Sequence, residues 1–420
     1  MVSEAKRTGA EKLLAALPMP GIEGTPEAGW AREARARARA RMLDAGAPVK
    51  RDEYWKYTDP TPLTAPLAEV TEAEDAAGAA HPFPEVDRAR FINGRFRADL
   101  TTVPQGVAML ALSEALYQDL GIARTLYGVL EAAGQEKVAR PLAALNTACA
   151  TDGVVIQATG KATLHIEQSH VGEGASLLHH VIRVETGAEL TLLESGTTSN
   201  TVMEVVLADG AVFNHIRLQT GERIPSATHI FADVAADAAF KSFTFSADGA
   251  LTRNEVVMTM SGDQGSGHIA GAVMGQGRSH VDNTVFVTHD AVDCESRQVF
   301  KTVLADRAAG VFQGKIYVKP GAQKTDGYQI SQAVLLTDGA EFLVKPELEI
   351  YADDVACSHG STTGGLDETA LFYLRSRGVS RAEAEAMLVA SFVDEAIAEI
   401  ADQDLADLMR AEVARWMATR

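Results

Sequence analysis

Cys357 and His359 are the two residues whose types and spacing most clearly offer chemistry in this sequence. An extended backbone carries residues i and i+2 on one face, so a strand here places a thiol beside an imidazole. A thiolate binds iron in iron-sulfur clusters, and a neutral imidazole can replace a thiolate as an iron ligand. Two ligands are too few to hold a cluster tightly, so such a site would release its product and take further ligands from a partner chain. The structural alternative is that Cys357 packs inside a β-structure and His359 caps a turn.

The elements that position this pair can be predicted from the surrounding pattern. From Glu347 to Ala352 polar and apolar residues alternate as in a half-buried strand, and the glycines that begin with Gly360 end the extended stretch. Asp367 stands where a helix N-cap is expected, and Gly378 is suited to end that short helix. The chemistry therefore lies where β-structure gives way to helices.

The stretch from Lys345 to Gly378 resembles the C-terminal signature of the SufB/SufD family of iron-sulfur cluster assembly proteins. Its second part reads CSHGSTTGGLDETALFYLRSRG, which is closer to the SufD side of the family than to the SufB side. A weaker resemblance extends over most of the chain and includes the residues from Glu53 to Thr58. The resemblance implies a mainly β fold, a right-handed parallel β-helix flanked by an N-terminal mixed helical cap and a C-terminal helical domain.

The resemblance also implies a function. The chain is expected to be a non-catalytic scaffold subunit of the SUF complex that pairs with SufB through the β-helix and binds the ATPase SufC through its C-terminal helices. A homodimer of the isolated chain would use the same exposed sheet edge. His359 is expected to help form a transient iron-sulfur cluster, or to hold iron, opposite a SufB cysteine, and Cys357 is the weaker candidate for that role. No permanently bound cofactor is expected, and the expected contacts to SufC are Tyr373, Arg375 and Arg377.

Composition narrows the class of protein. The 420 residues carry a formal net charge of −19, which argues against nucleic-acid or anionic-membrane binding because both need a basic surface. Three cysteines far apart in sequence form neither a disulfide framework nor a zinc ribbon. No export signal is visible, and no run reaches the roughly 18 apolar residues of a membrane span. We therefore predict a cytoplasmic protein.

The first 150 residues are predicted to form a mixed, mainly helical domain. The arginine-rich segment from Ala28 to Ala45 is interpreted as a solvated helix surface, and the aromatic cluster from Glu53 to Thr58 as a contact that fixes the N-terminal segment to the body. An exposed connection follows from Thr71 to Pro84. Asn93-Gly94 between apolar residues predicts a type I′ hairpin.

Residues 151–358 are predicted to form the β-helix core, and residues 359–420 the helical domain that binds SufC. In the core, short alternating strands are separated by turns in which Gly-Ala recurs. The spacing favours a solenoid of about 20 to 25 residues per coil, although an antiparallel sandwich would share it. In the last domain, Ser380 and Glu383 form a capping box. The apolar stripe expected behind that box comprises Ala384, Met387, Leu388, Ser391, Phe392, Ile397 and Ile400.

Two other interpretations were weighed. Parallel β-helices can act on carbohydrates through carboxylates, here Asp353 and Asp354 with Glu347 and Glu349, but adjacent aspartates point to opposite faces of a strand. A primary scaffold of the SufB type, carrying the cluster itself, is disfavoured because Cys357 is the only cysteine near the signature. The segment from Gly310 to Lys315 falls one residue short of a phosphate-binding loop, so no ATPase activity is expected. Most other histidines are predicted to be surface or turn residues.

Overall fold

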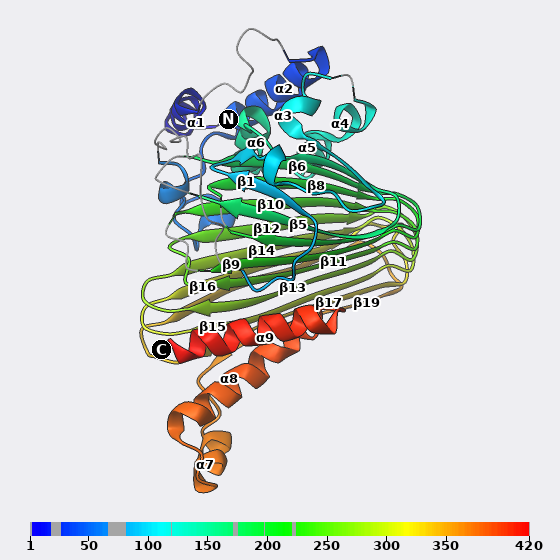
Figure 1. The fold of residues 1–420 in the computed structure, drawn as a ribbon. Helices are drawn as coiled ribbons and strands as arrows, with labels where there is room; N and C mark the ends of the chain where they lie inside the picture. The colour runs from blue at the N-terminus through cyan, green and yellow to red at the C-terminus, as the bar shows by residue number, and fades with distance from the viewer. Residues whose placement is uncertain are drawn as a thin grey trace.

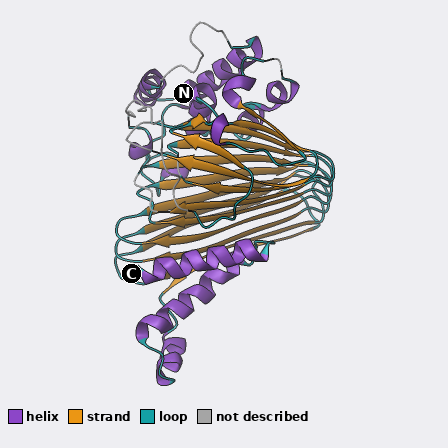
Figure 2. Cartoon of the chain, viewed as in Figure 1, coloured by secondary structure: helices purple, strands orange, loops and turns teal. Residues whose placement is uncertain are grey.

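The computed structural model describes residues 2–17, 27–65, 81–118, 120–170, 175–196, 198–220 and 224–419. Two large β-sheets face each other, with helices at one end and a helical projection at the other (Figure 1). Strands alternate between the two sheets along the chain, and Figure 2 shows the loops that join them gathered at the two edges. This arrangement is a parallel β-solenoid flanked by N-terminal and C-terminal helices, as predicted. The handedness and the domain boundaries stay predictions.

The strands form a ten-stranded sheet, called sheet 1 here, and a nine-stranded sheet, called sheet 2, within the described residues. All neighbours are parallel except two antiparallel pairs, β1 with β2 and β3 with β4. In spatial order, sheet 1 contains β19 (Val355–Gly364), β17 (Thr325–Leu335), β15 (Glu295–Leu304), β13 (Ser266–Gly275), β11 (Ala239–Ala247), β9 (Val212–Thr220), β7 (Glu189–Ser195), β5 (Lys161–Ser169), β1 (Arg88–Ile92) and β2 (Arg95–Phe96). Sheet 2 contains β18 (Glu341–Ile350), β16 (Ala309–Val318), β14 (His280–His289), β12 (Thr252–Met260), β10 (Ser226–Val234), β8 (Asn200–Leu207), β6 (Leu177–Val184), β4 (Val154–Ala158) and β3 (Val107–Ala111).

The coils lengthen along the solenoid. Glu189 lies opposite Val212, an advance of 23 residues, whereas Glu295 lies opposite Asp326, an advance of 31 residues. The predicted coil of about 20 to 25 residues was therefore too short for the later coils, whose strands are longer. The cause is visible in the strands themselves, since β7 has 7 residues and β17 has 11.

One corner of the solenoid repeats a left-handed backbone residue in coil after coil. Gly187 and Gly210 have φ values of 68° and 67°, and the same corner is occupied by non-glycine residues in the later coils. The backbone N–H of each corner residue donates to a carbonyl of the next coil, as from Gly187 to Asp209 at 3.2 Å. Two of the recurring glycines, Gly249 and Gly339, lie instead where sheet 1 passes to sheet 2, and Gly174 lies outside the described residues. The Gly-Ala repeat in the sequence therefore combines glycines from two different corners of the solenoid.

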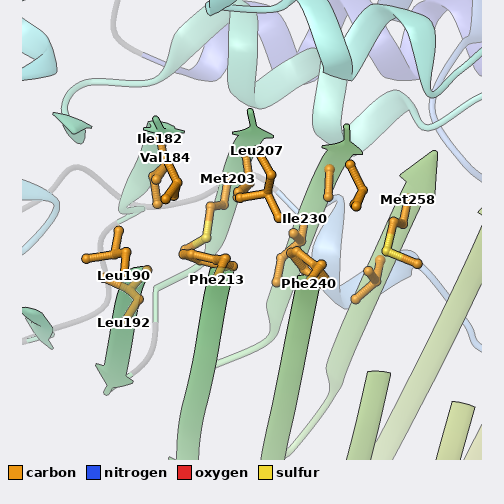
Figure 3. Packing of buried hydrophobic residues seen from close by; sticks show 14 of the residues in the cluster. Ile182, Val184, Leu190, Leu192, Met203, Leu207, Phe213, Ile230, Phe240 and Met258 are labelled. Carbon is orange, nitrogen blue, oxygen red and sulfur yellow. The ribbon is translucent and has the colours of Figure 1, made fainter. Parts of the chain in front are cut away.

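The core is the space between the two sheets. Side chains that point inward from both sheets interdigitate there, as Figure 3 shows for Leu190, Phe213 and Phe240 of sheet 1 facing Met203 and Ile230 of sheet 2. Burying such side chains stabilises each by roughly 1.5–3 kcal/mol. The pairing of hydrophobic faces fixes the register of every strand, including the terminal strands that matter below.

The N-terminal residues form a mixed cap, as predicted. Its helices are α1 (Glu4–Ala16), α2 (Gly29–Ala45), α3 (Leu112–Ala115), α4 (Gly121–Leu126), α5 (Val129–Ala133) and α6 (Pro141–Cys149), with 3-10 turns η1 (Glu53–Trp55), η2 (Thr61–Leu63) and η3 (Ala98–Leu100). Asn93 and Gly94 both have positive φ, which confirms the hairpin. Trp55 is buried beneath the guanidinium of Arg253, so the aromatic cluster does fix the segment to the body. The predicted connection from Thr71 to Pro84 lies largely outside the described residues.

The arginine-rich helix is only partly a solvated surface, which corrects the prediction. Arg35 is buried, pairs with Glu27 at 3.1 Å and donates to the carbonyls of Ala148 and Ala150 at the end of α6. Cations near the last carbonyls of a helix are stabilising, since those carbonyls lack helical partners. Arg35 therefore joins α2 to α6.

The C-terminal helices are α7 (Glu368–Ser376), α8 (Arg381–Ile397) and α9 (Gln403–Ala418), and α8 and α9 pack on the outer face of sheet 1 (Figure 1). The capping box of Ser380 and Glu383 is present. The predicted apolar stripe of α8 was partly wrong, because Met387 is 53% exposed, and the buried face instead comprises Ala384, Val389, Val393, Ala396 and Ile397. None of the helices in the described parts of the chain is both long and apolar enough to cross a membrane.

The prediction for the other histidines was wrong for most of those in the strands, which are buried. His179 is fully buried and lies 2.7 Å from Glu204, and His215 lies 3.0 Å from Glu194 beside Arg217. Burial lowers the pKa of His165 to about 3 and that of His180 and His289 to about 4. These three side chains are therefore neutral parts of the folded core near neutral pH.

Candidate functional site

Cys357 and His359 lie on β19, the terminal strand of sheet 1. They pair in register with Gly327 and Gln329 of β17, so both side chains share the face that points between the sheets. The extended stretch before them is interrupted at the corner around Asp353. Glu347 lies before this corner, on β18 of sheet 2, and Cys357 lies after it, on β19 of sheet 1. The strand also continues through Gly360 and ends at Gly364, later than the glycines predicted. The sequence was right about the shared face and wrong about the extent of the strand.

The Cys357 side chain is half-buried at the end of the solenoid. It packs against a small apolar cluster that includes Ile316 and Leu348, and its sulfur occupies the space that Gly327 leaves free. Burial raises the pKa of the Cys357 thiol, so it is protonated near neutral pH. A metal that binds this sulfur must displace its proton.

The His359 side chain is exposed at the open end. Directly behind it in register is Gln329, which is 1% exposed and whose two amide atoms have no hydrogen-bond partner in the structure. In the described part of the chain, no group of three or more His, Cys, Asp or Glu side chains is arranged to hold a metal ion. What the site offers is one accessible imidazole and one half-buried thiol on an open sheet edge.

The carboxylates considered for carbohydrate chemistry are held by cations or lie exposed. Glu349 accepts from Lys315 at 2.7 Å, and the hydrogen bond from Lys315 lowers the pKa of that carboxyl. Glu347 accepts from the Tyr54 hydroxyl at 2.9 Å. A general acid for glycoside cleavage needs a raised pKa, whereas the pKa of Glu349 is lowered. Asp353 and Asp354 are exposed at the corner, and the structure gives this alternative no support.

A second candidate surface lies on α7 and α8. Tyr373 is 55% exposed and the guanidinium of Arg377 stacks 4.5 Å from its ring centre, while Arg375 is exposed beside them. The prediction missed Phe372, which is 74% exposed, and placed Met387 in the core. Large apolar side chains this exposed on neighbouring helices mark an interaction surface. The signal available in the sequence was that Phe372 and Tyr373 are adjacent, so a helix cannot bury both on one face.

The geometry defines a β-solenoid with a Cys-x-His pair on an open sheet edge, and comparison with known proteins places it in a family. Residues 165–392 match the model of the SufBD core domain of SUF system iron-sulfur cluster assembly. The chain belongs to the SufB/SufD family.

Within that family, the similarity is to SufD. The chain is 28% identical over 398 residues to the iron-sulfur cluster assembly protein SufD of Escherichia coli, covering 89% of this chain and 90% of that protein. It is 28% identical over 386 residues to a SufBD family protein of iron-sulfur cluster assembly from Synechocystis, with 84% of each chain covered. A shorter match of 129 residues, 30% identical, aligns 30% of this chain with 9% of the SufD of Plasmodium falciparum.

Proposed function

We propose that this chain is a non-catalytic subunit of a SUF complex, where it pairs with a SufB homologue and binds a SufC ATPase. The observation that carries the proposal is the open end of the solenoid. Both sheets end there in strands without a further neighbour in the described residues, and one of these strands bears His359 and Cys357. A partner added at this end would bring its own ligands to the same place.

Pairing through the open end follows from the chemistry of strand edges. β18 and β19 each present unpaired backbone N–H and C=O groups at alternate residues along their outer edge, except that Pro346 in β18 has no N–H to offer. Such an edge is a template for another strand, whose main-chain hydrogen bonds supply affinity and whose side chains supply specificity. A SufB homologue with the same two-sheet end would continue both sheets at once. In the absence of that partner, a second copy of this chain would take its place.

A nascent iron-sulfur cluster, which is the cargo of the complex, would form at this junction. His359 would supply an imidazole nitrogen to iron, and the partner would supply thiolates. Cys357 would join only when a metal displaces its proton, since burial raises the pKa of this thiol. A cluster held by few ligands from two chains is released when the chains move apart. Such a site suits assembly and transfer better than permanent storage.

The surface of α7 and α8 would bind SufC. Phe372, Tyr373 and Met387 present apolar area, and Arg375 and Arg377 stand at its rim. Aromatic and arginine side chains are the residues that dominate binding energy at interfaces. ATP hydrolysis by SufC would then move α7 and α8 relative to the solenoid.

The test is co-expression of the tagged chain, under anaerobic conditions, with the SufB and SufC homologues of its own genome. The proposal predicts that both co-purify with the chain in a fixed ratio. It further predicts that His359→Ala retains both partners while iron-sulfur enzymes in the cell lose activity. If neither partner is retained by the wild-type chain, the proposed function is wrong. A matched control is His268→Ala, since that histidine lies on β13 and contacts Glu399, in the turn that follows α8, away from the open end.

A further inference from the structure

Lys301 on β15 is an unusual residue on the outer face of sheet 1. It is 1% exposed, although it is a lysine, and its ammonium group forms an ion pair with Glu395 of α8. It also lies 4.8 Å from the ring centre of Phe392, one turn earlier on the same helix. A buried ammonium group is unfavourable unless it is paired and hydrogen-bonded, so this contact is specific.

A chain of hydrogen bonds leads from Lys301 to the strand that carries the candidate site. The ammonium group also donates to the side-chain carbonyl of Gln332 on β17. The amide nitrogen of Gln332 then donates to the hydroxyl of Thr362 on β19 at 3.1 Å. The three residues lie opposite one another in register across the three strands. Thr362 stands three residues after His359, so a helix of the C-terminal domain is connected to the site strand through side chains alone.

The direction of this connection is fixed by chemistry. An ammonium group only donates, so the oxygen of the Gln332 amide must face Lys301 and its nitrogen must face Thr362. Without Lys301 the Gln332 amide is free to turn, and its bond with Thr362 has no fixed direction, because a hydroxyl group both donates and accepts. β19 depends on such contacts more than inner strands do, because in the described residues β17 is its only neighbour in the sheet.

We propose that Lys301 is a positioning residue through which the docking of α8 holds β19, and with it His359, in place. The importance of His359 itself rests on the function proposed above. When α8 moves away from sheet 1, Glu395 leaves Lys301, the uncovered ammonium group can turn from Gln332 to solvent, and the outer strand loosens. Through these hydrogen bonds, a partner bound at α7 and α8 can affect the strand at the open end of the solenoid.

The test is hydrogen–deuterium exchange of the purified full-length chain, followed by mass spectrometry. We expect the β19 amides, residues 355–364, to exchange about fivefold faster in Lys301→Met and in Gln332→Leu, the effect of losing about one hydrogen bond. Amides in β9 and β11 should exchange as in the wild type. The matched control is Glu399→Gln, which changes the 2.9 Å contact between the turn after α8 and His268 on β13 without touching β17 or β19.

Unchanged exchange of β19 in both variants would overturn the proposal, as would an equal acceleration in Glu399→Gln. Should Lys301→Met fail to fold, Gln332→Leu carries the test alone, because that side chain is only partly buried and its change removes the contact with Thr362 directly. The experiment needs no partner protein. A negative result for the positioning role of Lys301 is therefore separate from a negative result for the proposed complex.

Discussion

Truncation of Phe372 should weaken binding of SufC more than any other single change on α7. The side chain is 74% exposed in the isolated chain. A phenylalanine buries roughly 200 Å² at an interface, so about 150 Å² is free for a partner. At about 25 cal/mol per Å² this area stabilises the complex by up to about 3.8 kcal/mol. Incomplete burial reduces the expected loss for Phe372→Ala to about 2–3 kcal/mol, or about 30- to 150-fold in Kd.

The assay is isothermal titration calorimetry of the purified chain with the SufC homologue of its genome. The matched control is Leu100→Ala, which truncates a side chain that is 42% exposed beside the N-terminal cap. The control should bind like the wild type. Thermal unfolding of Phe372→Ala should be unchanged, since the residue contributes little to the core of the free chain. Binding of Phe372→Ala within twofold of the wild type would refute the reasoning.

Three further predictions concern the site and the core. In cells, His359→Ala should lower the activity of iron-sulfur enzymes with the complex still assembled, and unchanged activity would contradict its role. Gly187→Ala should lower the free energy of unfolding by about 1 kcal/mol, because the residue has a positive φ. Gly196→Ala should lower it by more than about 3 kcal/mol, because the added methyl group would also clash with the Gln168 carbonyl. Urea unfolding measures both values. His165, His180 and His289, whose pKa values burial lowers, bind protons better when unfolded, so stability should fall as pH drops from 6.5 towards about 4. His289→Asn should flatten that dependence.

The sequence predicted well whatever depends on local pattern. The hairpin at Asn93-Gly94, the cap at Asp367 and the shared face of Cys357 and His359 each follow from residues a few positions apart. A period of two places alternate residues together in any strand, whichever sheet it joins. The candidate site could therefore be placed on one face before its sheet was known.

Features that depend on the register of distant coils could not be predicted in the same way. His179 meets Glu204, 25 residues later, only because β6 and β8 are neighbours in sheet 2. Coil length changes along the chain, so no single period in the sequence brings such partners together. The same holds for Lys301, which looks like any surface lysine until α8 is seen to cover it. Met387 was predicted to be buried because it belongs to an apolar stripe, but the sequence of a helix does not show which part of such a stripe another element covers.

The central claim is that the open end of the solenoid pairs with a SufB homologue, and photo-crosslinking tests it most directly. A benzophenone amino acid is placed at Ser358, which is exposed on β19 one residue before His359. A second version carries the probe at Lys161, whose side chain is 80% exposed on β5, far from that end. In the co-expressed complex, irradiation should join position 358 to the SufB homologue and leave position 161 free of SufB. A complex that co-purifies intact but gives no SufB crosslink from position 358 would contradict the account.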